Sequence, residues 1–402
     1  MSTERIVVGL EIGTSKVCAA VASLRREGEI KILGVGQAPS RGVRKSEIVD
    51  FETASKCVRE ALVDAEEKSD VEIRGVYLAV SGGHIKSFNN RGMVTIPEER
   101  GEIYEEDFED VQAAAREVTI PPENSFLLSL VQHYYVDGQD GVLNPVGMMG
   151  RKLEADFHII HGVSTRIKNS LRCLAELDIE VEDVVFSPVA AAQVVFDQAQ
   201  KNLGGLMIDM GGGTTGYVLY ADGAMKRSGC LSVGGDHVTN DISLGLRIPM
   251  ARAERLKVEQ GSVLLEEVVP GEMIVLKDET GFAGREIERA MLHNIVHCRV
   301  RETLELVRKD IGDDRLIDFL GAGVFLTGGG SLVNGVEELV QEVFGHPVQL
   351  THKPTVSGVT SAFDDPLLST AIGLTKYAQA TQESKPEGWL KRLLPKIRLF
   401  GR

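Results

Sequence analysis

The sequence predicts an α/β protein of two lobes, with a smaller α+β unit inserted into the first. The main observation is a repeat: an apolar run that ends in an acid, glycines and hydroxyl residues occurs at 6–16 and again at 205–216. The second is that further apolar runs enter glycine turns and alternate with helical patterns along the chain. Two similar turns, one from each half, predict a single anion held from both sides.

Each copy of the repeat is predicted to be a buried strand that enters a tight turn, whose glycines let backbone N–H groups approach an anion. Glu11 and Asp209 hold equivalent places, where they can organise a hydrated Mg²⁺. A lone glycine triplet is more often a flexible turn, but the paired acids favour a phosphate site. The candidate phosphate-binding residues are Gly13, Thr14, Ser15, Lys16, Gly211, Gly212, Gly213, Thr214 and Thr215.

A further glycine turn follows the apolar run 323–327, and other polar residues lie between it and the second phosphate turn. Glu254 and Lys257 are three residues apart, so one face of a helix would present them to a ribose and a purine. On its own such a pair is more often a surface salt bridge. The candidate nucleotide-binding residues in this region are Gly234, Gly235, Asp236, Glu254, Lys257, Gly328, Gly329, Gly330 and Ser331.

Helical spacing and changes of texture give the other elements in chain order. Apolar spacing predicts a helix over 52–68, and extended segments on either side of an acidic helix at 105–118 predict the α+β insert. Helices are expected at 164–177, at 284–311 with mixed charges, from about Asn334, and over 366–374.

The order of these elements resembles the superfamily of actin, Hsp70 and the sugar kinases, and more specifically the FtsA family of bacterial cell-division actins. Four segments carry the second resemblance: 9–14, 39–42, 76–82 and 144–147. It implies an actin-like ATPase fold with two lobes of ribonuclease-H-like mixed sheets flanked by helices, an FtsA-type insert subdomain (1C), and ATP with Mg²⁺ as cofactors.

The resemblance also implies a domain plan and partners. The plan is a lobe 1 core (1A) at 1–83 and 163–203, the insert at 84–162, a lobe 2 core (2A) at 204–243, subdomain 2B at 244–318, the lobe 2 core and its return to lobe 1 at 319–378, a linker at 379–387 and a terminal helix at 388–402. Subdomain 2B would receive the acidic C-terminal peptide of FtsZ at Arg299, Arg301 and Glu302, although a solvated helix face is an equally good interpretation of any one of them. Filament-forming self-association and recruitment of later divisome proteins through the insert are also expected, and no nucleic acid is.

Length and composition agree with a globular protein that stays out of the bilayer core. The 402 residues are 43% hydrophobic with five scattered cysteines, which favours a reducing compartment. No apolar run approaches the 18 residues that a transmembrane helix needs. The length leaves no room for the substrate-binding region of an Hsp70 chaperone.

The last 15 residues predict an amphipathic membrane-binding helix. At about 100° per residue, the apolar side chains fall within an arc of about 140° and the cations fall outside it. Pro395 should bend or break this helix. The apolar residues are Trp389, Leu390, Leu393, Leu394, Ile397 and Phe400, and the cations are Lys391, Arg392, Lys396, Arg398 and Arg402.

Charge supports attachment through this tail. The chain carries −15 and the tail +5, so the body carries −20 (−15 minus 5). An anionic leaflet repels the body but attracts each Lys or Arg of the tail with about 1 kcal/mol. We therefore expect peripheral, reversible binding to the cytoplasmic side of the inner membrane at the division site. The alternative is that the helix docks on its own domain.

Three functions remain open: a membrane tether for FtsZ filaments, a small-molecule kinase of the same superfamily, and a pilus-assembly adaptor. The tail favours the first, and no catalytic Asp near a sugar pocket can be placed for the second. Where relatives carry a water-orienting Glu or Gln, this chain has Ser187, a poor general base and a weak catalytic candidate. We expect tight ATP binding with slow hydrolysis.

Overall fold

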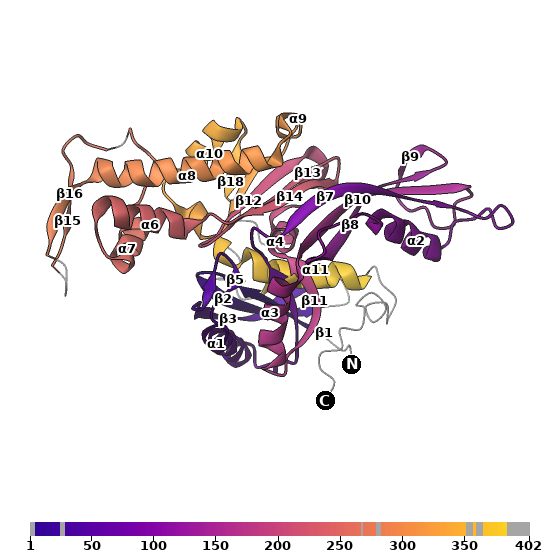
Figure 1. The fold of residues 1–402 in the computed structure, drawn as a ribbon, viewed down its shortest axis with the longest axis horizontal. Helices are drawn as coiled ribbons and strands as arrows, with labels where there is room; N and C mark the ends of the chain where they lie inside the picture. Colours follow the sequence, from indigo (N-terminus) through magenta and orange to yellow (C-terminus); the bar gives the residue numbers. More distant parts are fainter. Residues whose placement is uncertain are drawn as a thin grey trace.

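The molecule consists of two lobes and an insert that extends from one side (Figure 1). The computed structural model describes residues 5–24, 29–266, 268–278, 283–350, 357–358 and 365–383. Lobe 2 lies along the top of Figure 1 and lobe 1 below its centre. The insert and the hairpin β15–β16 lie at opposite ends of the long axis.

Lobe 1 is built on a six-stranded sheet in the order β11-β6-β1-β2-β3-β19. Strands β1, β2 and β3 form an antiparallel meander, and β6 and β11 add in parallel beside β1. The sheet strands are β1 (Arg5–Ile12), β2 (Lys16–Leu24), β3 (Ile30–Pro39), β6 (Gly75–Val80), β11 (Glu180–Phe186) and β19 (Ser357–Gly358). The other elements are the small hairpin β4 (Val43–Arg44) and β5 (Glu47–Ile48), and helices α1 (Phe51–Ser69), α3 (Ser164–Ala175), α4 (Ser187–Val195) and α11 (Ser369–Glu383).

Lobe 2 repeats this plan with five strands in the order β14-β13-β12-β17-β18. Its strands are β12 (Gly205–Met210), β13 (Thr215–Ala221), β14 (Ala224–Leu231), β17 (Gly323–Thr327) and β18 (Val348–Leu350), with a distal hairpin β15 (Met273–Leu276) and β16 (Arg285–Glu288). Its helices are α5 (Gln198–Leu203), α6 (Gly235–Leu246), α7 (Met250–Gln260), α8 (Arg289–Ile311), α9 (Asp314–Asp318) and α10 (Val336–Phe344).

The two sheets share one topology, which explains the sequence repeat. In each, a three-stranded meander is followed by two parallel strands on the side of its first strand. The repeated turn joins the first two strands of each meander. The same hydrogen bond closes it in both copies: Gly13 N–H donates to the Lys16 carbonyl and Gly211 N–H to the Thr214 carbonyl, each at 2.9 Å.

Helix α4 contacts the sheets of both lobes, and α11 packs on α4 and on the lobe 1 sheet, so this pair of helices joins the two lobes (Figure 1). Glycines allow this close packing, because a Cβ on Gly373 would lie 2.0 Å from the Ala190 carbonyl oxygen and one on Gly9 2.3 Å from the Ala371 oxygen. The hydrophobic core around these helices contains side chains from both lobes, such as Val8 and Val218. Separate cores fill the outer part of lobe 2 and the insert.

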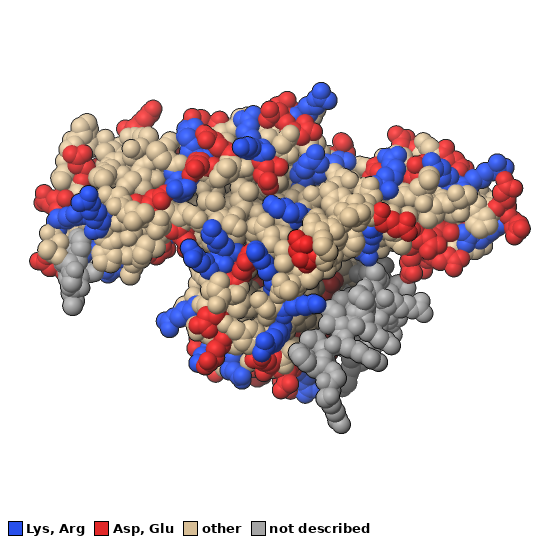
Figure 2. All heavy atoms as spheres, in the orientation of Figure 1, with Lys and Arg blue, Asp and Glu red and all other residues tan. Residues whose placement is uncertain are grey.

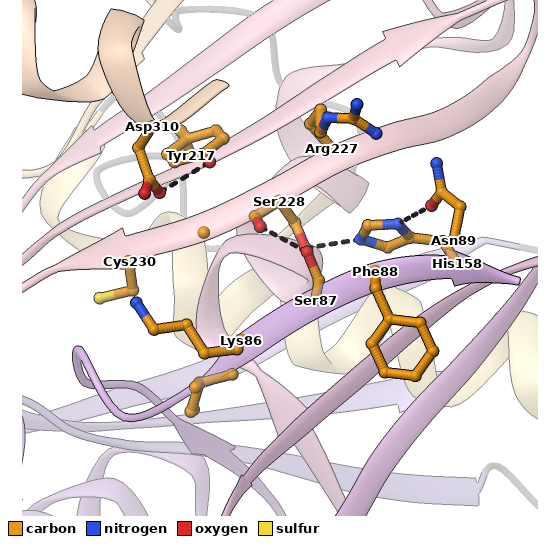
Figure 3. A pocket seen from close by; sticks show the side chains of 12 residues that line it. Lys86, Ser87, Phe88, Asn89, His158, Tyr217, Arg227, Ser228, Cys230 and Asp310 are labelled. Atoms are coloured by element: carbon orange, nitrogen blue, oxygen red, sulfur yellow. Dashed lines mark hydrogen bonds between the residues drawn. The ribbon is translucent and has the colours of Figure 1, made fainter. Parts of the chain in front are cut away.

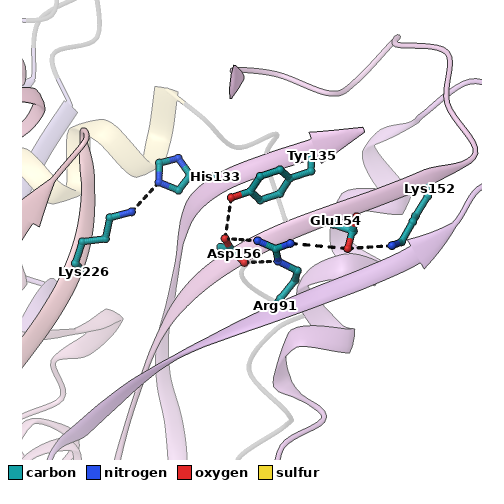
Figure 4. Close-up of polar contacts among 7 residues, drawn as sticks. All are labelled: Arg91, His133, Tyr135, Lys152, Glu154, Asp156 and Lys226. Carbon is teal, nitrogen blue, oxygen red and sulfur yellow. Dashed lines mark hydrogen bonds and ion pairs between the residues drawn. The ribbon is translucent and has the colours of Figure 1, made fainter. Parts of the chain in front are cut away.

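The insert is a four-stranded antiparallel sheet in the order β7-β10-β8-β9, with one helix packed on it. Its elements are β7 (Lys86–Thr95), α2 (Glu105–Arg116), β8 (Asn124–Val136), β9 (Gln139–Val142) and β10 (Lys152–Val163). Arg91 forms an ion pair with Asp156 at 2.6 Å, and Tyr135 donates to the same carboxylate at 3.0 Å (Figure 4). These pairs fix three neighbouring strands to one another.

The insert belongs to lobe 1 in sequence but is hydrogen-bonded to lobe 2. Ser87 and Asn89 on β7 donate to the carbonyls of Ser228 and Lys226 on the edge strand β14. His158 bridges Asn89 and Ser228 at 2.6 and 2.7 Å, and its burial lowers its pKa to about 4 (Figure 3). Figure 4 shows a further contact, from Lys226 to His133 at 2.7 Å. The edge of the lobe 2 sheet is thereby covered.

A cavity of about 460 Å³ lies at this junction, between β7 and β14 (Figure 3). Lys86, Arg227 and Asp310 are the charged residues that line it. None of the residues that the sequence predicts to bind nucleotide or metal lies in its wall.

The helices predicted over 52–68, 105–118 and 164–177 agree with α1, α2 and α3 to within two residues at each end, and the other three predicted helices start or end differently. The helix predicted over 284–311 begins only at Arg289, because residues 285–288 pair with β15 as a strand in which Ile287 is the buried residue. The helix expected near Asn334 begins at Val336, after Gly335 in the left-handed region (φ 78°). The one expected over 366–374 is a 3-10 turn at Pro366–Leu368 and then α11, which continues to Glu383 and so covers 379–383 of the expected linker.

Acidic side chains gather on the insert around α2, whereas both signs are mixed over the rest of the visible face (Figure 2). The first turn of α2 alone carries Glu105, Glu106 and Asp107. Within the ranges given above, no helix is long and apolar enough to span a bilayer.

Candidate nucleotide site

The two predicted phosphate turns, one from each lobe, are in contact. A Cβ on Gly212 would lie 3.2 Å from the Ser15 Cβ, and one on Gly213 would lie 2.4 Å from the Thr14 hydroxyl oxygen. Glycine at these positions therefore allows the lobes to close this far. The structure brings residues about 200 positions apart (213 minus 14) into one site.

Two acids and a lysine lie at this meeting point. Lys16 Nζ is 3.7 Å from Glu11 Oε2 and donates to the Leu367 carbonyl. The pKa of Asp209 is raised to about 7, first by burial and then by the nearby Glu11 charge, against the opposing effect of Lys16. Burial also opposes the charge of Lys16, but the acidic groups around it, Glu11 first and Asp209 among them, outweigh burial, and the lysine pKa is raised. Lys16 therefore stays charged between acids from both lobes.

The acids fit a divalent cation. Glu11 Oε2 is buried and accepts no hydrogen bond from the residues described. Two carboxylates close together, one of them with a buried oxygen that accepts no hydrogen bond, are the kind of oxygen ligands that Mg²⁺ takes, directly or through its water shell.

The third glycine turn lies behind Asp209. A Cβ on Gly328 would lie 2.4 Å from Asp209 Oδ1, and one on Gly330 2.6 Å from the Met210 Cβ. Ser331 Oγ closes the turn by donating to the Gly328 carbonyl at 2.7 Å. Because β12 and β17 are parallel neighbours, their carboxyl ends deliver the second and third turns to the same edge of the sheet.

Gly234, Gly235 and Asp236 support the second turn from behind. The N–H groups of Gly235 and Asp236 donate to the Gly211 and Gly212 carbonyls at 3.0 and 2.7 Å. Since these two N–H groups are occupied within the protein, this segment shapes the turn rather than presenting those donors to an anion.

Glu254 and Lys257 form the ion pair that their spacing allows, at 2.7 Å. Lys257 Nζ also donates to Thr239 Oγ1 at 2.9 Å and to the Gly235 carbonyl at 3.2 Å. The pair is therefore tied to the first turn of α6, next to the second phosphate turn. Thr239 was not predicted, because only the packing of α6 on α7 brings it there.

Ser187 is buried at the start of α4 and donates to the Val80 carbonyl at 3.1 Å. Its neighbour Pro188 lies against the turn strand, 2.6 Å from where a Gly216 Cβ would be. The hydroxyl is thus already used in holding β6 to α4.

The structure also places residues at this site that the sequence did not indicate. Ser46, on the β4–β5 turn, donates its N–H to Thr14 Oγ1 at 2.8 Å and contacts Thr214 Oγ1 at 3.0 Å. The backbone nitrogen of Lys45 lies 2.9 Å from the position that a Cβ on Gly213 would take. Nothing in the Lys-Ser dipeptide itself signals this position.

The predicted FtsZ-binding residues lie on α8, away from the glycine turns in the sequence and already paired. Arg299 forms ion pairs with Asp241, at 2.5 Å, and with Glu302. Arg301 pairs with Glu342 at 2.6 Å. The predicted membrane residues of 388–402 lie outside the described part of the chain.

Two lobes of one topology, joined by α4 and α11 and bringing three glycine turns together, define an actin-like protein. Solved structures agree: the PilM-PilN type IV pilus biogenesis complex matches with a TM-score of 0.62 at 16% identity, covering 94% of this chain and 99% of that one. MreB5 of Spiroplasma citri bound to ADP matches with a TM-score of 0.56 at 16% identity, covering 94% and 98%. At these identities the likeness concerns the fold.

Sequence comparison identifies the family. The model for the cell division protein FtsA matches residues 206–373, and the model for the SHS2 domain inserted in FtsA matches residues 82–161. The FtsA of Pseudomonas aeruginosa is 34% identical over 94% of this chain and 90% of its own. That of Escherichia coli K12 is 33% identical over 97% and 96%. The chain belongs to the FtsA family, and its general role is in cell division.

Proposed function

We propose that this protein binds one ATP with Mg²⁺ between its lobes, polymerises, and tethers FtsZ filaments to the cytoplasmic membrane at the division site. Later divisome proteins are recruited through the insert. The observation that carries the nucleotide part is the contact of Gly212 and Gly213 with Ser15 and Thr14, because it brings both halves of the repeat to one place.

The residues around this contact have separate roles in the proposal. The hydroxyls of Thr14 and Thr214 and the Lys16 ammonium bind the phosphates, and Glu11 and Asp209 hold Mg²⁺. The ion would neutralise phosphate charge. Gly328 gives the adenosine close access to the backbone beside Asp209. The fold likeness to MreB5, solved with ADP, supports a nucleotide of this class.

Hydrolysis is expected to be slow. Rapid cleavage needs a group that orients water against the terminal phosphate, and the candidate Ser187 hydroxyl already donates to Val80. In this proposal ATP acts as a switch for closure and polymerisation.

Membrane attachment and FtsZ binding rest on charge. The +5 tail follows an acidic body, and only the tail is attracted to an anionic leaflet. For FtsZ, the arginines at 299 and 301 on α8 offer guanidinium groups to an acidic peptide, which must compete with Asp241 and Glu342 for them. The likeness to PilM, a pilus-biogenesis protein, is one of fold, and the cationic tail favours the division role.

Co-sedimentation tests the proposal. The full chain with ATP should pellet with anionic vesicles and carry FtsZ filaments with it. Deletion of residues 388–402 should release it into the supernatant while ATP binding persists, and Trp389→Glu should do the same with the tail cations intact. Sedimentation that survives deletion of the tail would refute the anchor.

A further inference from the structure

The hairpin β4–β5 links the two phosphate turns directly. Its tip residue Ser46 contacts Thr14 of the first turn through its N–H, at 2.8 Å, and Thr214 of the second through its hydroxyl, at 3.0 Å. In Figure 1, β5 lies on the side of lobe 1 that faces lobe 2. One small hairpin is thus in contact with the phosphate turns of both lobes.

The tip has an unfavourable backbone. Lys45 and Ser46 both lie in the left-handed region, with φ of 52° and 61°. Two-residue hairpin turns of this kind prefer Asn-Gly, because other residues crowd there. This chain has a lysine and a serine at two positions where glycine would fit more easily. Backbone outliers of this kind are found most often at functional sites.

The base of the hairpin is held firmly in lobe 1. Gly42 accepts hydrogen bonds from the N–H groups of Val49 and Asp50 at 2.8 and 3.0 Å. Glu47 forms an ion pair with Arg166 of α3 at 2.5 Å. The tip can therefore respond to what lies between the turns while its base stays fixed.

The tip also brings positive charge to the turns. Lys45 is half-buried and has no carboxylate within ion-pair distance among the residues described. Its charge reaches lobe 2, because the pKa of His237, lowered first by burial, is lowered further by Lys45 and Arg299. A half-buried cation that follows strand β4 and directly precedes Ser46, and that has no partner acid among the residues described, is suited to an anion.

The place of this anion along the nucleotide follows from the fold. The adenosine elements, Gly328 and the pair of Glu254 and Lys257, all belong to lobe 2. A phosphate chain that starts there reaches the turn of lobe 1 last, and the hairpin contacts that turn at Thr14. The hairpin therefore lies at the terminal phosphate.

We propose that Lys45 and Ser46 bind the terminal phosphate of a nucleoside triphosphate, so that the β4–β5 hairpin distinguishes ATP from ADP. This inference rests on the nucleotide function proposed above. Without nucleotide, Ser46 occupies the hydroxyls of Thr14 and Thr214. A terminal phosphate takes over these hydroxyls and the Lys45 charge, and a diphosphate leaves the hairpin without its ligand.

Nucleotide titration of the full chain tests this. Dissociation constants for Mg-ATP and Mg-ADP should be measured for the native protein, Lys45→Gln and Ser46→Gly. Lys45→Gln removes the charge, and Ser46→Gly removes the hydroxyl while easing the backbone. Lys31→Gln, an exposed change on β3, is the matched control. We expect about a tenfold loss of ATP affinity for Lys45→Gln, with ADP affinity changed less than about twofold.

The outcomes separate the two proposals. Native protein that binds neither nucleotide overturns the nucleotide function and this inference with it. Native protein that binds both, with variants that lose ATP and ADP affinity equally or lose neither, overturns the inference alone. Circular dichroism of each variant shows whether a loss reflects unfolding, and the ATP-to-ADP ratio remains informative for any variant that folds.

Discussion

Gly213 of lobe 2 and Thr14 of lobe 1 leave no room between them: a Cβ on the glycine would lie 2.4 Å from the threonine hydroxyl oxygen. Contacts below 3.0 Å are not tolerated by a real Cβ, so something must move. The Lys45 backbone nitrogen lies 2.9 Å from the same point, so a Cβ at residue 213 could not avoid the threonine by shifting toward the hairpin. The two lobes can therefore close this far partly because residue 213 has no Cβ.

Gly213→Ala should force the two turns apart. We expect a stability loss of about 1–3 kcal/mol from overpacking and a loss of ATP affinity of at least about tenfold, because donors from the two lobes no longer converge. Denaturant titration and nucleotide titration measure the two effects. Unchanged ATP affinity in a folded variant would mean that the contact has no part in binding.

Asp209 should make the nucleotide-free protein less stable at higher pH. Its pKa is raised from 3.8 to about 7, so the folded state holds a proton that the unfolded state has lost, and stability is lost as pH rises through this range. Between pH 5 and pH 8 the free energy of unfolding should fall by roughly 2 kcal/mol more in the native protein than in Asp209→Asn. Parallel pH profiles of the two proteins would show that this carboxyl titrates normally.

His158, at the junction of the insert with lobe 2, should make the protein less stable at lower pH. Its pKa is lowered to about 4, so stability is present above pH 6.5 and is lost as pH falls toward 4. From pH 7 to pH 5 the native protein should lose roughly 2 kcal/mol that His158→Gln does not lose. Equal losses in both proteins would place the acid sensitivity elsewhere.

Arg299 offers a test of FtsZ binding that controls for its internal pairing. Arg299→Glu should weaken binding of an acidic FtsZ tail peptide, with nucleotide affinity changed much less. Asp241→Asn frees the same guanidinium from its 2.5 Å ion pair and should leave peptide affinity equal or higher. If both variants lose affinity alike, the integrity of α6 and α8 matters, and the arginine does not bind the peptide.

The fold could be predicted largely because it is repeated. An acid after an apolar strand, followed by a glycine turn, appears twice at 6–16 and 205–216, and the two sheets show the same topology. The predicted start of α8 is wrong, because residues 285–288 form a strand by pairing with β15, a partner that local periodicity does not reveal.

Residues of the candidate site could be predicted where the residue type itself indicates a local structure or a ligand. They could not be predicted where tertiary packing brings the residue to the site. Glycines and acids in the turns could be read directly. The position of Lys45 and Ser46 depends on left-handed φ angles that their side chains do not favour, and Thr239 reaches Lys257 only through the packing of α6 on α7. The N–H groups of Gly235 and Asp236 were candidates for an anion, but they donate to Gly211 and Gly212.

The central claim, one adenine nucleotide held by both lobes, is tested most directly by calorimetric titration of the full chain with Mg-ATP. The account predicts one ATP per chain, with Lys16→Ala in lobe 1 and Asp209→Ala in lobe 2 each weakening binding by at least about tenfold and reducing self-association with it. Full ATP affinity in either variant, while the fold is intact, would contradict a site shared between the lobes.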